Sequence, residues 1–107
     1  MKIFVLAMTV LIVSPTIVMA QEPAKSATIT IKDFDFSPMD VTIPAGGSVT
    51  WTNRDEEPHT VAASDGSFHS PGLGTNSTYS FTFPTAGSFD YICSVHPFMH
   101  GTVVVTK

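Results

Sequence analysis

The stretch at residues 91–101, YICSVHPFMHG, carries most of the information in this chain. It places Cys93, His96 and Met99 three residues apart, and its proline and glycine predict a tight loop. On such a loop a thiolate, an imidazole and a thioether can converge on one point. Two His and one Cys in a plane with a weak axial Met form a blue-copper site. The second His is predicted to be His59, which follows a proline upstream.

Two of these residues could have different roles. Cys93 is the only cysteine, so it cannot form a disulfide within the chain. It could pair with another chain, be an inert buried thiol, act as a nucleophile or bind a metal, and the neighbouring His and Met favour the metal. Met99 could instead be a core residue. Outside the N-terminal leader, Met39 is its only competitor as a thioether ligand.

Short alternating runs on both sides of this stretch predict an all-β fold. Apolar residues recur with a period of two, and Gly- and Pro-containing turns separate the runs. We expect strands at 28–31, 41–43, 48–52, 59–63, 78–83, 88–93 and 102–106, with the run at 59–63 the weakest. Several short strands of this kind are typical of a sandwich or barrel. Because Phe89 and Tyr91 share a face with Cys93, the thiol is expected to point into the core.

Residues 1–20 are interpreted as a cleaved secretory signal peptide. Lys2 precedes an apolar run, and VMA at 18–20 is a small-residue cleavage site. Residues 21–26 are expected to form a flexible tail, and 27–107 the folded domain. The mature domain is then expected to be exported to the periplasm, with no membrane segment left after cleavage. An uncleaved anchor is the alternative.

Charge argues against a nucleic-acid partner. The formal net charge of the whole chain is −4, and loss of Lys2 with the signal peptide changes it to −5. Such a domain has no basic surface with which to neutralise phosphates.

The segment from 29 to 105 resembles the cupredoxins of the plastocyanin/azurin group, and most of all amicyanin. The matching pieces are VTWTN at 49–53, PH at 58–59, YSFTF at 79–83, AG at 86–87, CSVHPFM at 93–99 and GTVVV at 101–105. The resemblance implies a Greek-key β-sandwich of about eight strands with one type 1 copper ion. It also implies a monomeric, soluble single-electron carrier. Its redox partners would be a dehydrogenase donor and a c-type cytochrome acceptor.

The resemblance further implies an electron exit at the exposed edge of His96, framed by Pro97, Phe98 and Leu73. One departure concerns the residue after the first ligand His. Amicyanins often have Asn there, whose side chain braces the two ligand loops, whereas this chain has Thr60. We therefore expect different hydrogen bonding around the site.

Three further features are interpreted as ordinary surface. The acidic run at 55–57 could steer a basic partner, but a solvated turn is the favoured interpretation. His69 and His100 are expected to lie at the surface rather than to bind metal.

Other function classes fit the sequence less well. A copper enzyme would need a second metal centre, and no His-x-His pair occurs. A copper-handling protein without a dedicated electron-transfer partner is the main alternative, although such proteins favour several exposed Met, His or Cys side chains. A metal-free β-sandwich would not explain why Cys93, His96 and Met99 occur together. Zinc on the same ligands also remains open.

Overall fold

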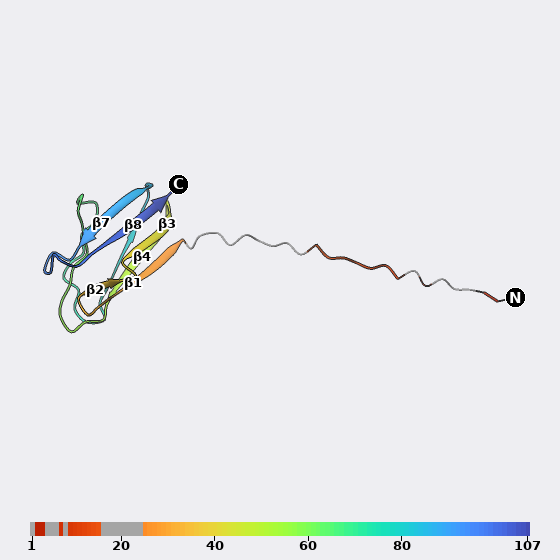
Figure 1. Cartoon of the computed structure of the whole chain (residues 1–107), viewed down its shortest axis with the longest axis horizontal. Coiled ribbons are helices and arrows are strands. Elements are labelled where there is room, and N and C mark those ends of the chain that lie inside the picture. The colour runs from red at the N-terminus through yellow and green to blue at the C-terminus, as the bar shows by residue number, and fades with distance from the viewer. Residues whose placement is uncertain (1, 4–6, 8, 16–24) are drawn as a thin grey trace.

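Eight β-strands form the domain in the computed structural model, which describes residues 2–3, 7, 9–15 and 25–107. They are β1 (Ser26–Lys32), β2 (Asp35–Ser37), β3 (Asp40–Pro44), β4 (Ser48–Asn53), β5 (Ala62–Ala63), β6 (Thr78–Thr82), β7 (Gly87–Ile92) and β8 (His100–Thr106). No helix occurs among the described residues. Figure 1 shows the strands as a small two-layered body at one end of the chain.

The strands make two four-stranded sheets, ordered β2-β1-β4-β6 and β3-β8-β7-β5. The β1–β4 and β3–β8 pairs are parallel, and the remaining pairs are antiparallel. Parallel neighbours cannot be joined by a hairpin, so the chain crosses between the sheets. The predicted all-β sandwich is therefore confirmed.

Two strands differ from the sequence expectation. β2 was not predicted, because Ser37 and the proline after it favour a turn. It pairs with β1 through a two-residue hairpin turn. The predicted strand at 59–63 is reduced to β5, and His59 joins Leu73 through an isolated bridge instead.

Aromatic side chains fill the space between the sheets. Trp51 of β4 lies edge-to-face against Tyr91 of β7, with ring centroids 5.4 Å apart. Phe68 contacts Trp51, Phe81 and Phe83, with centroid distances of 5.0 to 5.8 Å. Burying rings of this size is the main favourable term in such a small domain.

The ends of β1, β4 and β7 and the start of β8 meet at one end of the sandwich. The loop between β7 and β8 lies at this end, away from the point where the chain enters β1 (Figure 1). It contains three of the four predicted ligands. Cys93 directly follows Ile92, the last residue of β7, and its side chain is buried as predicted.

The predicted signal peptide lies partly outside the described residues. Its described apolar residues are exposed, among them Leu11 and Ile12. No described helix is long and apolar enough to cross a membrane. Most of the predicted tail at 21–26 also lies outside the described part, and β1 already includes Ser26. The cleavage site and the domain boundary remain predictions.

Gly101 is required by the close approach of Tyr91. A Cβ atom at residue 101 would overlap Tyr91 Oη and would lie 2.5 Å from Tyr91 Cζ and 2.7 Å from the Met39 carbonyl oxygen. The Tyr91 ring is fully buried and cannot move aside freely. A side chain at this position therefore disturbs the core beside the ligand loop.

Gly101→Ala is expected to lower the free energy of unfolding by about 1–3 kcal/mol, the usual cost of overpacking a core. Urea denaturation of the metal-free protein measures this change. Gly72→Ala is the matched control, since a Cβ there meets nothing within 4 Å; its effect should be within about 0.5 kcal/mol. Equal stability of the two variants would contradict the packing argument.

Candidate metal centre

His59 is fully buried, and both of its ring nitrogens have a neighbour. Nδ1 lies 3.7 Å from Cys93 Sγ, and Nε2 lies 2.8 Å from Asp55 Oδ2. The backbone of His59 is fixed by two hydrogen bonds with Leu73. Because an ionised carboxylate can only accept hydrogen bonds, Nε2 donates to Asp55. The lone pair of Nδ1 is then directed toward the sulfur, where a metal would be bound.

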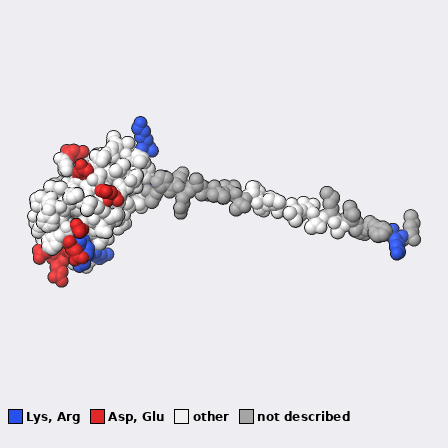
Figure 2. Space-filling view, viewed as in Figure 1, with Lys and Arg blue, Asp and Glu red and all other residues white. Residues whose placement is uncertain are grey.

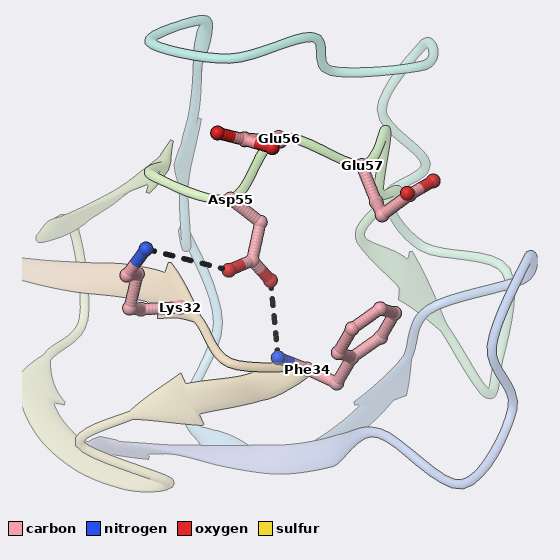
Figure 3. Close-up of a pocket in the computed structure, with 5 residues that line it drawn as sticks. All are labelled: Lys32, Phe34, Asp55, Glu56 and Glu57. Atoms are coloured by element: carbon pink, nitrogen blue, oxygen red, sulfur yellow. Dashed lines mark hydrogen bonds and ion pairs between the residues drawn. The ribbon is translucent and has the colours of Figure 1, made fainter.

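Asp55 is buried although it is charged, because several donors surround it. Its carboxylate accepts the backbone N–H groups of Asp33 at 2.7 Å and Phe34 at 3.0 Å, in addition to His59. Lys32 Nζ lies 4.0 Å away (Figure 3). Burial by itself raises the pKa of Asp55, but the N–H groups of Phe34 and Asp33 and the His59 ring outweigh it and hold the pKa below its usual value.

The Asp55 carboxylate therefore joins two parts of the site. It fixes the His59 ring and it anchors the turn that carries Phe34. Both turn residues have positive φ, 52° at Asp33 and 59° at Phe34. Primed hairpin turns require such angles, but a bulky side chain rarely adopts them. This backbone strain, of order 1–3 kcal/mol per residue, persists only where the surroundings hold it in place.

Cys93 is buried in a ring of donors. The Thr60 N–H donates to its sulfur at 3.3 Å. Burial raises the pKa of the thiol, but the backbone N–H groups of Thr60, His96 and Val95 outweigh it, so the pKa is lower than usual. A lowered pKa favours the thiolate, the form of cysteine that binds metals.

His96 lies across from His59, with ring centroids 5.2 Å apart. It is partly exposed. Phe34 packs edge-on against both imidazoles, at 5.4 Å from His59 and 5.1 Å from His96. Phe98 lies 6.0 Å from His96 on the outer side and is 69% exposed.

Met99 is the better of the two candidate methionines. Its side chain is only 1% exposed, whereas that of Met39 is 44% exposed. The ligand loop closes on itself through hydrogen bonds from Met99 N to the His96 carbonyl and from Cys93 N to the Met99 carbonyl. These bonds fix the backbone of three predicted ligands relative to one another.

The Thr60 hydroxyl joins the two ligand segments. Thr60 Oγ1 accepts the N–H of Ser94 at 2.7 Å and lies 2.6 Å from Ser94 Oγ. The expected difference in hydrogen bonding is thus a pair of hydroxyl groups, which lies next to the bond from the Thr60 N–H to the Cys93 sulfur.

The donor set suits a soft or borderline metal ion. One thiol, two imidazoles and a thioether match the ligand chemistry of copper better than that of hard cations. Within residues 25–107 and the described leader residues, no three His, Cys, Asp or Glu side chains form a ready-made cage. The four-ligand set thus depends on the thioether and on the buried His59–Cys93 contact.

Two sequence interpretations need correction. Leu73 was expected to frame the exposed edge of His96, but it is buried because its backbone pairs with that of His59. Asp55 was expected to be part of a solvated turn, but only Glu56 and Glu57 are exposed. His69 and His100 are exposed, as predicted.

Two contributors to the site were not identified from the sequence. Asp55 precedes His59 by four residues, and that spacing is the only local signal of its role. Phe34 lies on a turn, where an aromatic residue gives no indication of what it contacts.

The domain is a two-sheet β-sandwich whose Cys-His-Met loop lies at one end, where the Cys of the loop and a second His are buried. These features define a class of small proteins with one metal site. Comparison with known proteins gives the family. The model of the Cupredoxin-like domain matches residues 2–105, and the chain belongs to this family.

Several relatives have comparable length. The chain is 42% identical over 90 residues to amicyanin-alpha of Methylorubrum extorquens, covering 79% of this chain and 76% of the relative. The crystal structure of amicyanin from Paracoccus versutus has a TM-score of 0.70 and 36% identity, covering 78% and 84% of the two chains. A purple cupredoxin from Nitrosopumilus maritimus has a TM-score of 0.70 and 35% identity, covering 75% and 99%.

Asp55→Asn is expected to weaken copper binding by about 10–100-fold, the usual effect of losing a partner that orients a ligand His. An amide oxygen can replace only part of the carboxylate, so the His59 ring or the Phe34 turn loses its anchor. Competition with a copper chelator measures the affinity. Glu56→Gln is the control, because Glu56 is an exposed neighbour. Equal affinities in both variants would show that Asp55 does not position His59.

Proposed function

We propose that His59, Cys93, His96 and Met99 bind one type 1 copper ion and that the domain is a soluble carrier of single electrons. The observation that carries this proposal is the buried contact between His59 Nδ1 and Cys93 Sγ, 3.7 Å apart, with the other ring nitrogen held by Asp55. When bound, copper would supply the one-electron Cu(I)/Cu(II) couple.

The protein contributes a site that changes little with the redox state. His59 is held through its backbone by Leu73 and through its ring by Asp55. The short hydrogen-bonded loop fixes the other three ligands. Pro97 restricts the backbone beside His96. These hydrogen bonds and the proline hold the ligands whether or not a metal is bound. The charge of a bound copper ion can therefore change without large movements of the ligands.

Electrons would enter and leave through an apolar docking face made of Phe34, His96 and Phe98. Phe34 is 38% exposed, and its ring lies 6.5 Å from that of Phe98. Figure 2 shows uncharged surface at the left end of the domain, where Figure 1 shows the β7–β8 loop, with acidic side chains above and below it. A small apolar patch suits the weak, transient interfaces of redox proteins.

The likeness to amicyanins supports redox proteins as the partners. We propose a dehydrogenase as the donor and a c-type cytochrome as the acceptor. The domain acts as a monomer in the periplasm. Its role is that of an electron carrier, in keeping with its likeness to amicyanins.

Addition of Cu(II) to the metal-free domain is expected to produce an intense blue thiolate-to-copper absorption band. Cys93→Ser should abolish the band, because the thiolate is its source. Met99→Leu should keep copper but change the band or the reduction potential, since an axial Met binds weakly. A colourless or pale adduct of the wild-type protein would contradict the proposed function.

Phe98→Ala is expected to slow electron transfer from the reduced, copper-loaded protein to an oxidised c-type cytochrome severalfold without changing the absorption band of the Cu(II) form. The reason is that Phe98 belongs to the docking face but is not a ligand. Stopped-flow mixing measures the rate. Val104→Ala removes an apolar side chain of β8 that is also exposed and serves as the control. An unchanged rate in Phe98→Ala would remove Phe98 from the docking face.

A further inference from the structure

The hydroxyl of Thr60 is buried where the chain beyond β4 meets the loop beyond β7. Its Oγ1 has three polar neighbours: the Ser94 N–H at 2.7 Å, Ser94 Oγ at 2.6 Å and Cys93 Sγ at 3.8 Å. Ser94, in contrast, is exposed. One buried hydroxyl thus contacts both the predicted thiolate ligand and the residue that follows it.

The single proton of this hydroxyl has two possible acceptors. The Ser94 N–H already donates to Thr60 Oγ1. If Thr60 donates to Ser94 Oγ, the sulfur of Cys93 keeps its backbone N–H donors but receives no hydroxyl bond. If Ser94 Oγ donates to Thr60 instead, the Thr60 proton is free to point at the sulfur.

We infer that Ser94 donates to Thr60 and that Thr60 donates to Cys93 Sγ, so that Thr60 gives the sulfur a hydroxyl bond in addition to its N–H bond. A charged acceptor attracts a donor more strongly than a neutral hydroxyl does. The exposed Ser94 hydroxyl can form a hydrogen bond with water in either arrangement. The buried Thr60 hydroxyl can donate only to a protein atom. Thr60 is therefore a positioning residue, and Ser94 sets the direction of its bond.

The consequence concerns the electron density on the sulfur. Hydrogen bonds around a ligand Cys withdraw charge from the thiolate and tune the reduction potential. An additional donor to Cys93 favours the reduced, less positively charged metal and so raises the potential. This inference rests on the proposed function, because it needs Cys93 to be a copper ligand.

The first test compares the reduction potentials of the copper-loaded wild-type protein and Thr60→Val. Valine keeps the shape and the backbone N–H but removes the hydroxyl. We expect the preference for Cu(I) to fall about tenfold, which lowers a one-electron potential by about 59 mV. The blue band should shift to longer wavelength, since a thiolate with fewer hydrogen bonds gives up charge more easily. Thr60→Ser keeps the hydroxyl, so its reduction potential and its blue band should match those of the wild-type protein.

A matched control exists in the opposite half of the fold. Thr50 Oγ1 and Ser80 Oγ form a similar hydroxyl pair, 2.7 Å apart, on β4 and β6. Thr50→Val should leave the potential and the band unchanged. In the metal-free protein, Thr60→Val should lower the free energy of unfolding more than Thr50→Val, because the partly buried N–H of Ser94 also loses its acceptor.

Ser94→Ala tests the direction of the bond. With the proposed direction, Thr60 still donates to the sulfur, so the potential stays at or below the wild-type value. A potential above the wild-type value would show that Ser94 had been taking the Thr60 proton, and would overturn the inference. So would an unchanged potential in Thr60→Val. Absence of a blue band in the wild-type protein contradicts the proposed function instead.

Discussion

The buried hydrogen bond between Asp55 Oδ2 and His59 Nε2 is the interaction on which the end of this sandwich depends. A carboxylate in a protein interior is costly unless every lone pair finds a donor. Here the donors come from His59 and from the backbone of the β1–β2 turn. Satisfying this one charge therefore fixes a candidate ligand ring and shapes a turn more than twenty residues away in the sequence. The strained backbone at Phe34 is held by the same carboxylate, and the Phe34 ring then covers both imidazoles.

The opposite wall of the site is made by a second, neutral set of hydrogen bonds. Thr60 lies next to His59 in the sequence, and its N–H and hydroxyl reach Cys93 and Ser94 on the other ligand segment. The hydroxyl pair links these two ligand segments, whereas the charged contact holds the His59 segment to the β1–β2 turn. The aromatic core below them, with Tyr91 packed against Gly101, keeps the strands beneath this loop in register. These restraints come from the protein alone, so a redox metal could change charge there without a change of shape.

Much of this arrangement could be predicted from the sequence, and the exceptions share a cause. The alternation at 48–52 and 88–93 predicted β4 and β7, because a half-buried strand repeats with a period of two. The spacing of Cys93, His96 and Met99 predicted a ligand loop, because all three residues lie within seven consecutive positions of the sequence. In contrast, the burial of Asp55 depends on the Phe34 turn, and the burial of Leu73 depends on pairing with His59. Neither partner is local, so neither could be identified from the neighbouring residues. β2 was missed for the same reason, since its three residues form a strand only beside β1.

The central claim is that this domain holds one copper ion with a cysteine sulfur and two histidine nitrogens, on ligand segments whose positions the protein fixes through its own hydrogen bonds. X-ray absorption at the copper edge tests it most directly, on the loaded protein in both redox states. We expect one close sulfur and two nitrogen neighbours, with nearly the same distances in Cu(II) and Cu(I). A shell without sulfur, or distances that change greatly on reduction, would contradict the claim.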